Sequence, residues 1–242
     1  MINSLLRLNM TKLNLKENIE RVRERIANAC DKVGRKVEEL KLIAVTKQVS
    51  PEIINEAIEL GITDIGENRV QEILKKIDLI NHQAKTHMIG HLQTNKAKQI
   101  IGKVETIQSI DSLKIANEIN KRAQEKNLVV KGLIQIHTAK EETKFGLNPE
   151  GLEAFLEKAS DFKNIYFEGL MTIGTFTDDE KEIRRCFTLL RDLLDKFRSY
   201  NSGNIQLKEL SMGMSSDFEL AIEEGSTIVR IGTAIFGERK YN

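Results

Sequence analysis

The sequence of 242 residues contains no tryptophan, and it has only 2 prolines and 2 cysteines. So few prolines exclude a collagen-like or proline-rich disordered chain, because even ordinary proteins carry about 5% proline. Cys30 and Cys186 lie far apart, with no C-x-x-C or Cys/His spacing around them. This pattern argues against a disulfide framework and against a zinc site, so we expect no bound metal.

Long apolar runs and an excess of charge of one sign are also missing. No run approaches the roughly 18 apolar residues of a membrane-spanning helix, and Leu5-Leu6 is too short for a signal-peptide core. Lys and Arg total 37 and Asp and Glu total 36, which gives a net charge of +1. We therefore expect a soluble cytoplasmic protein with neither nucleic acid nor a membrane as a partner.

Eight short β-rich runs recur along the chain, with amphipathic stretches between them. They are Leu42–Thr46, Asp64–Gly66, His87–Gly90, Thr106–Ile110, Val129–His137, Tyr166–Ile173, Glu209–Met212 and Ile228–Ile231. Several are nearly continuous apolar runs, such as LIAV and TIVRI, as expected of parallel strands that are buried on both faces. Alternation of strand and helix predicts parallel pairing with right-handed crossovers. Eight such units favour an α/β fold of the (β/α)8 TIM-barrel type over an open doubly wound sheet.

The amphipathic stretches predict details of the helices. In the longest stretch, apolar residues repeat at helical spacing at Ile183, Phe187, Leu190 and Leu194. Another helix follows Asp111, with a predicted buried stripe of Leu113, Ala116, Ile119 and Ala123. Ser216 and Glu219 have the spacing of a capping box at the start of a short helix.

We expect one domain over residues 1–242, because no linker, low-complexity tract or repeat interrupts the series. Only nine residues follow Thr233, too few for the helix that usually closes such a barrel. Leu15–Ala29 is instead strongly amphipathic, and we predict that this N-terminal helix covers the gap. Residues 1–13 are expected to form a poorly defined extension.

Lys47 directly follows the first strand-like run, LIAVT. In a barrel of this type the reactive residues come from the carboxyl ends of strands and from the loops after them. A lysine at that mouth is desolvated yet reachable, which suits an amine that forms a Schiff base. Position alone favours the more ordinary interpretation, an exposed loop lysine.

The last two strand-like runs end in residues typical of an anion site. Gly232 and Thr233 follow the eighth run, which carries Arg230, and Ser215 lies after the seventh, at the predicted start of a helix. Barrel phosphate sites are commonly built from these two loops, where backbone N–H groups and hydroxyls hold the anion. Each residue alone has a structural explanation, helix capping for Ser215 and a tight turn for Gly232. A lysine, an arginine and a phosphate cradle together describe a site for pyridoxal 5'-phosphate (PLP).

Four stretches carry a resemblance to a known family: LIAVTK, IGENRVQE, HMIGHLQTNK and SMGMSSDFELAIEEGSTIVRIGTAIFG. In this order, over residues 14 to 239, the chain closely resembles the PLP homeostasis proteins. The resemblance implies a single-domain barrel like the N-terminal domain of alanine racemase, with PLP attached covalently to Lys47 as a Schiff base. It also implies cofactor-binding roles for further residues: Asn68 close to the cofactor, Arg230 facing the pyridine nitrogen, Ser215, Gly232 and Thr233 on the phosphate, and His91 and Met212 near the pocket.

An arginine opposite the pyridine nitrogen weakens carbanion chemistry, because a group that stays protonated does not protonate the ring. Alanine racemase adds a second domain and an opposing tyrosine, for which this chain shows no counterpart. We therefore expect a protein that buffers and delivers PLP within the cell, without catalytic residues or robust activity, and with apo PLP-dependent enzymes as recipients. The alternatives are a weakly active amino-acid racemase and a cofactor-free interaction barrel. A monomer and a weak dimer are both compatible with the composition.

Two further signals carry less weight. His87 and His91 are four residues apart, but the segment between them is predicted as strand and turn, so a helical zinc pair is not expected. Lys144 occupies a family position in Thr143-Lys144-Phe145-Gly146, where the family usually has Ser-Lys-Ser-Gly. The departure favours a solvated loop lysine over a second PLP-handling lysine.

Overall fold

The computed structural model describes residues 2–140 and 145–238, with side chains from residue 14 onward except at 201–202. Its helices are α1 Ile2–Lys32, α2 Pro51–Glu59, α3 Val70–Lys76, α4 Ala97–Ile100, α5 Leu113–Glu125, α6 Leu152–Ala159, α7 Glu180–Phe197, α8 Phe218–Glu223 and α9 Thr233–Phe236. Its strands are β1 Lys41–Val45, β2 Asp64–Glu67, β3 Lys85–Met88, β4 Thr106–Ile110, β5 Val130–Gln135, β6 Ile165–Met171, β7 Asn201–Ser202, β8 Ile205–Ser211 and β9 Ile228–Ile231. Short 3-10 helices lie at Val37–Glu39, Thr94–Lys96 and Pro149–Gly151.

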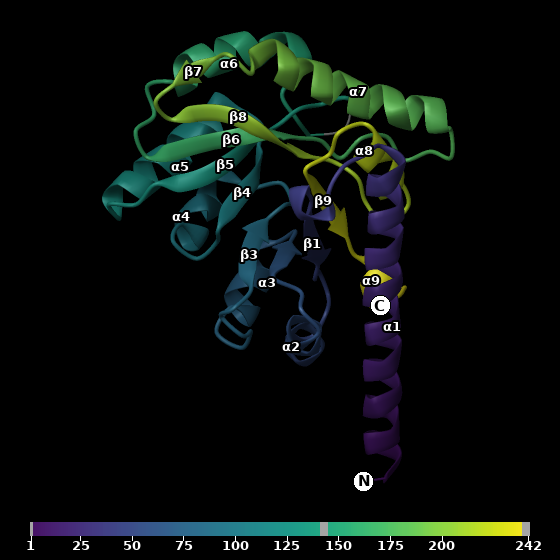
Figure 1. Ribbon diagram of the computed structural model, residues 1–242. Coiled ribbons are helices and arrows are strands. Elements are labelled where there is room, and N and C mark those ends of the chain that lie inside the picture. The colour runs from purple at the N-terminus through teal and green to yellow at the C-terminus, as the bar shows by residue number, and fades with distance from the viewer. Residues whose placement is uncertain (1, 141–144, 239–242) are drawn as a thin grey trace.

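Eight of the strands form a closed parallel barrel, which confirms the predicted fold (Figure 1). Neighbours along the chain pair from β1 to β6, β6 then pairs with β8, β8 with β9, and β9 returns to β1. The predicted strands match these eight, although β8 begins four residues before the predicted Glu209. The two-residue strand β7 was not predicted, and it pairs antiparallel with β8.

The core lies on both faces of the barrel wall. Leu42 and Ala44 of β1 face the outer helices, so Ile43 between them points into the barrel, because side chains alternate along a strand. There Ile43 clusters with Leu133, Met171 and Ile228 from β5, β6 and β9. Strands buried on both faces explain why the sequence shows apolar runs in place of alternation.

The N-terminal helix α1 packs against α8 and α9, as predicted (Figure 1). Its apolar residues Leu15, Ile19, Val22 and Ile26 are buried in one cluster with Phe218, Ile222 and Ile235. Asn18 adds a hydrogen bond from its Nδ2 to the Ile235 carbonyl oxygen, at 3.0 Å. The helix therefore covers the part of the barrel wall beside the last strand.

Two helix predictions were wrong in detail. α8 begins at Phe218, and its N-cap is Asp217 in place of the predicted Ser216. The Asp217 Oδ1 atom accepts instead from the Met214 N–H, at 2.5 Å. In α5 the buried stripe contains Ile115, and Leu113 is exposed. The stripe predicted for α7 is confirmed.

No helix in the described part of the chain is long and apolar enough to cross a membrane.

Candidate functional site

A cavity of about 700 Å³ opens at the carboxyl ends of the strands. Six of the predicted site residues line it together: Lys47, Asn68, Ser215, Arg230, Gly232 and Thr233. They come from the ends of β1, β2, β8 and β9, which lie next to one another because these strands are neighbours in the barrel. Parallel pairing thus brings together residues that are up to 186 positions apart in sequence.

Lys47 lies in a turn that is tied closely to its surroundings. Thr46, just before it, is buried and donates from its backbone N–H to the Gly66 carbonyl oxygen at 2.9 Å. Gln48, just after it, has φ +60°. This left-handed conformation is uncommon for a residue other than glycine, so the turn is held by its contacts.

Asn68 follows β2 and lines the cavity. Its Oδ1 atom is buried, and within the described residues it has no hydrogen-bond partner. Gly90 packs directly against the Asn68 backbone, since a Cβ atom at Gly90 would lie 2.3 Å from the Asn68 carbonyl oxygen. A buried acceptor of this kind suits a bound group that donates a hydrogen bond.

Arg230, on β9, is only 4% exposed. Its guanidinium donates from Nη1 to the Ser211 Oγ and from Nη2 to the Thr172 carbonyl oxygen, each at 2.7 Å. Ser211 in turn donates to Oε1 of Gln108, at 2.7 Å. Burial lowers the pKa of Arg230 to about 10, while the Asp217 carboxylate acts to raise it. At neutral pH the residue therefore remains a cation that is held in a fixed orientation at the cavity.

The two loops predicted to bind an anion meet at Ser215. The Ser215 Oγ accepts hydrogen bonds from the Gly232 N–H at 3.2 Å and from the Ala234 N–H at 3.3 Å. These N–H groups lie at the first turn of α9, where backbone donors have no partner inside the helix. The two loops form a candidate cradle for an anionic group, in which the Ser215 O–H is the donor, since both lone pairs of its oxygen accept N–H groups.

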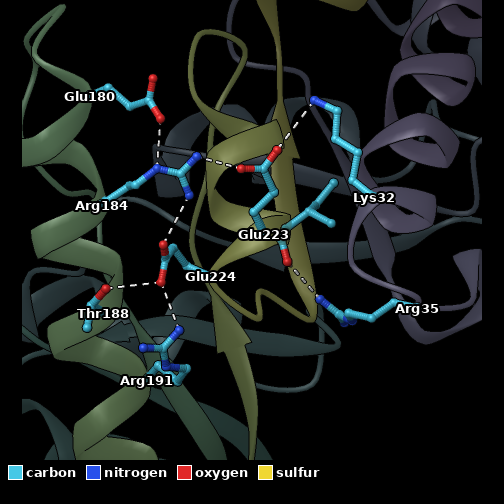
Figure 2. A network of polar contacts seen from close by, with 9 residues as sticks. Lys32, Arg35, Glu180, Arg184, Thr188, Arg191, Glu223 and Glu224 are labelled. Carbon is cyan, nitrogen blue, oxygen red and sulfur yellow. Dashed lines mark hydrogen bonds and ion pairs between the residues drawn. The ribbon is translucent and has the colours of Figure 1, made fainter.

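The helix α8, which follows the Ser215 turn, is fixed by ion pairs on two sides (Figure 2). From α7, Arg184 binds both Glu223 and Glu224, at 2.5 and 3.1 Å. Arg191 binds Glu224 at 2.8 Å, and Lys32 of α1 lies 3.5 Å from Glu223. The turn that carries Ser215 thus leads into a helix that is anchored to both of its neighbours.

Two predicted residues do not line the cavity. Met212 is fully buried in the core outside the barrel wall. His91 is partly exposed, stacks on the Phe145 ring at 3.8 Å and has its Nδ1 atom 3.1 Å from Asp111 Oδ2. Lys144 lies outside the described residues.

The sequence did not indicate a buried charge network beside Lys47 or the apolar part of the cavity lining, which is formed by Val45, Ile89, Ile173, Phe176, Met214 and Ala234. Ile173 and Phe176, after β6, line the cavity, and Phe176 is 86% exposed. The network joins Lys76 of α3 to Glu67 and Glu72, both at 2.8 Å. The spacing of Glu72 and Lys76 along one helix was the only signal for it, and such pairs are usually solvated.

Comparison with known proteins identifies a matching family and several relatives of the chain. The profile of the family described as "Alanine racemase, N-terminal domain" matches residues 14–240. The chain is 46% identical to the pyridoxal phosphate homeostasis protein of Aquifex aeolicus, over 95% of this chain and 100% of that protein. It is 34% identical to the protein of the same name from Haemophilus influenzae, over 95% of this chain and 98% of that protein.

Solved structures also resemble the chain. A protein from Bifidobacterium adolescentis, described only as an unknown protein, superposes with a TM-score of 0.90 and 36% identity, over 94% of this chain and 96% of that one. PipY of Synechococcus elongatus, solved with PLP bound, gives a TM-score of 0.77 and 31% identity, over 88% and 100%. An alanine racemase from Clostridium difficile shares the fold, with a TM-score of 0.72 and 17% identity, over 95% of this chain and 57% of that one.

Proposed function

The chain belongs to the family of pyridoxal phosphate homeostasis proteins, and from this premise we propose that it binds PLP in the cavity at the barrel mouth. It thereby takes part in maintaining the intracellular supply of this cofactor. The observation that carries the proposal is the convergence of Lys47, Arg230 and the Ser215 cradle on one cavity of about 700 Å³.

The cavity residues fit the chemical groups of PLP. When bound, PLP supplies an electrophilic aldehyde and a pyridine ring that draws electrons strongly only when its nitrogen is protonated. Lys47 would hold the aldehyde carbon covalently through its amine, with release of the aldehyde oxygen as water. Ser215, Gly232 and Thr233 would hold the phosphate, and Asn68, whose buried Oδ1 has no partner among the described residues, lines the same cavity. His91 and Met212 would act only indirectly, since neither lines the cavity.

Arg230 makes holding the cofactor more favourable than amino-acid chemistry. Its guanidinium is cationic at neutral pH and donates hydrogen bonds, so it does not give a proton to the pyridine nitrogen. Within the described residues, the cavity lining contains no tyrosine to act as an opposing acid or base. We propose that the protein buffers PLP and delivers it to apo PLP-dependent enzymes. A cytoplasmic location and a monomeric or weakly dimeric state remain predictions.

Covalent attachment is tested with Lys47→Ala against Lys140→Ala, a control that removes an exposed lysine after β5. The protein has no tryptophan, so an imine absorbance band in the visible stands out against weak absorbance at 280 nm. We expect the band in the wild type and in Lys140→Ala and its loss in Lys47→Ala, with borohydride reduction and peptide mass locating PLP on Lys47. A band that persists in Lys47→Ala would reject this attachment site.

Delivery and catalysis are separated by two further measurements. The PLP-loaded protein is mixed with the apo form of a PLP-dependent aminotransferase, and recovery of aminotransferase activity reports transfer. Incubation with single amino acids then tests the racemase alternative through loss of chirality and release of keto acid. Robust turnover would contradict the carrier function.

A further inference from the structure

Lys76 is a buried cation that uses all of its donors beside the turn that carries Lys47. It is 9% exposed, and its Nζ donates to the Thr46 carbonyl oxygen at 2.9 Å and to Glu67 Oε1 and Glu72 Oε2 at 2.8 Å. An ammonium group has three N–H bonds, so these partners satisfy it completely. A buried ion pair is often no more stabilising than an apolar replacement, so its presence here calls for a role other than stability.

The partners of Lys76 grip the turn on both sides of Lys47. On one side, Thr46 is bound through its carbonyl oxygen by Lys76, and its hydroxyl donates to Glu67 Oε1 at 2.7 Å. On the other side, Glu72 Oε2 accepts the Gln48 N–H at 2.7 Å. Gln48 is the residue with φ +60°, and this conformation persists only where the surroundings impose it.

Both carboxylates of the network depend on Lys76. Glu67 is 1% exposed, and its Oε2 atom has no hydrogen-bond partner within the described residues. Burial raises the pKa of Glu67, and Lys76 and Thr46 oppose that rise. Burial acts in the same direction on Glu72, but the Gln48 N–H and Lys76 hold the pKa of Glu72 below its ordinary value. Without the Lys76 ammonium, the two neighbouring carboxylates would lose the cation that they share, and their negative charges would repel each other.

We infer that Lys76 is a positioning residue for Lys47: it locks the Thr46–Gln48 turn, directly at Thr46 and through Glu72 at Gln48, so that the Lys47 amine is presented to the cavity. Lys76 does not touch the cavity itself. Asn68 follows Glu67 directly, so the same network also fixes the chain at a second cavity residue. The inference rests on the proposed function, because it assigns Lys76 a part in attaching PLP.

The test compares Lys76→Met with Lys75→Met. Methionine keeps the unbranched stem and removes the ammonium, and Lys75 is the exposed neighbour on the same helix, so both variants change the net charge equally. The first measurement is amide hydrogen exchange of a peptide containing residues 46–49 in cofactor-free protein. The second is the rate at which PLP becomes trapped on Lys47 by borohydride after mixing, with thermal unfolding recorded for each variant.

We expect the amide hydrogens of residues 46–49 to exchange roughly tenfold faster in Lys76→Met. Local opening of the turn would no longer have to break the hydrogen bonds that hold Thr46 and Gln48. We expect attachment of PLP to be about 10- to 100-fold slower, the range that a small misplacement of a reacting group produces. Lys75→Met should match the wild type in both measurements. A purely structural role would lower the melting temperature and leave the attachment rate unchanged, and that result would overturn the inference.

If Lys76→Met does not fold, Glu72→Ala decides the question. Glu72 is partly exposed on α3, and alanine is a good helix former, while the Lys76 contact with Glu67 stays in place. Slower attachment in Glu72→Ala supports the inference, and attachment at the wild-type rate overturns it. If wild-type protein itself takes up no PLP on Lys47, the proposed function fails. If the wild type takes it up and the variants do so equally fast, only the role of Lys76 fails.

Discussion

At the scale of single residues, the position of the cavity residue Asn68 depends on Gly90, where no side chain fits. Gly90 lies against the backbone of Asn68, and an added Cβ would stand 2.3 Å from the Asn68 carbonyl oxygen and 2.7 Å from its Cα. Backbone atoms cannot rotate away as the end of a flexible side chain can. Any side chain at this position must therefore displace Asn68, which lines the cavity.

We predict that Gly90→Ala lowers the free energy of unfolding by about 1–3 kcal/mol, the usual cost of overpacking. Because Asn68 moves, PLP occupancy at subsaturating cofactor should fall as well. Urea unfolding and the visible absorbance of bound PLP measure the two effects. Gly151→Ala is the control, since its Cβ would meet only the Leu147 side chain, at 3.4 Å from Cδ1 and 3.8 Å from Cγ. Equal stability of the two variants would contradict the prediction.

Asp217 gives the stability of the protein a specific pH dependence. Burial raises its pKa above the ordinary value of 3.8, although the Met214 N–H and Arg230 act to lower it. The ionised form is thus less favourable in the folded protein than in the unfolded chain. The contribution of Asp217 to the free energy of unfolding is therefore fully present below pH 3.8, where the carboxyl is protonated in both states. It is lost as the pH rises through the raised pKa.

We predict that Asp217→Asn removes this loss, because asparagine keeps an oxygen for the Met214 N–H and does not ionise. The free energy of unfolding of the wild type minus that of the variant should therefore decrease as the pH rises from about 3.8 toward neutrality. Urea unfolding at a series of pH values measures this difference. A difference that grows with pH would show that the carboxylate is stabilised by the fold.

At the scale of elements, the strands were predictable because burial on both faces leaves apolar runs that few other structures produce. β7 has two residues and turns at Gly203, with φ +43°, so it is too short for any periodicity to appear. The start of α8 was misplaced because Ser216 and Asp217 are both good capping residues in sequence. Only the folded turn shows that Asp217 points back to Met214.

The sequence predicted those residues of the candidate site that lie at or just after the carboxyl ends of strands. Lys47, Asn68 and Arg230 converge because parallel strands place their carboxyl ends on one rim. Met212 precedes the turn and belongs to the core, which its place in a motif does not reveal. The role of Lys76 was not predictable, because its contact with Thr46 joins positions 30 apart and depends on how α3 packs.

The ion pairs around α8 should contribute measurably to stability (Figure 2). Glu224 is the shared partner of Arg184, Arg191 and the Thr188 hydroxyl, at 3.1, 2.8 and 3.0 Å. We predict that Glu224→Gln lowers the free energy of unfolding by about 1 kcal/mol, and that high salt reduces this effect by screening. Asp192→Asn, which removes an exposed partner of Arg191, is the control and should change stability by less than about 0.5 kcal/mol. Equal effects of both substitutions in chemical denaturation would contradict a shared network.

At the scale of the whole molecule, two clusters of apolar side chains pack outside the barrel wall. One cluster joins α1 to α2, α8 and α9, and the other lies beneath α5, α6 and α7. The strands connect them, because the sheet closes through β6, β8 and β9. A closed wall cannot lose a strand on one side without exposing the other cluster, so we expect the clusters to unfold together.

Matched cavities in the two clusters test this expectation. Ile19, in α1, and Ile119, in α5, are at most 1% exposed, and replacing either by alanine should cost about 2–5 kcal/mol. If residues 1–242 form one domain, each variant lowers the midpoint of a single urea transition, with an unchanged slope and coincident curves from circular dichroism and tyrosine fluorescence. Leu79→Ala, at a residue 61% exposed, should leave the midpoint nearly unchanged. Two transitions, of which Ile19→Ala moves one and Ile119→Ala the other, would instead mean that α1 and its neighbours fold as a separate unit against the barrel.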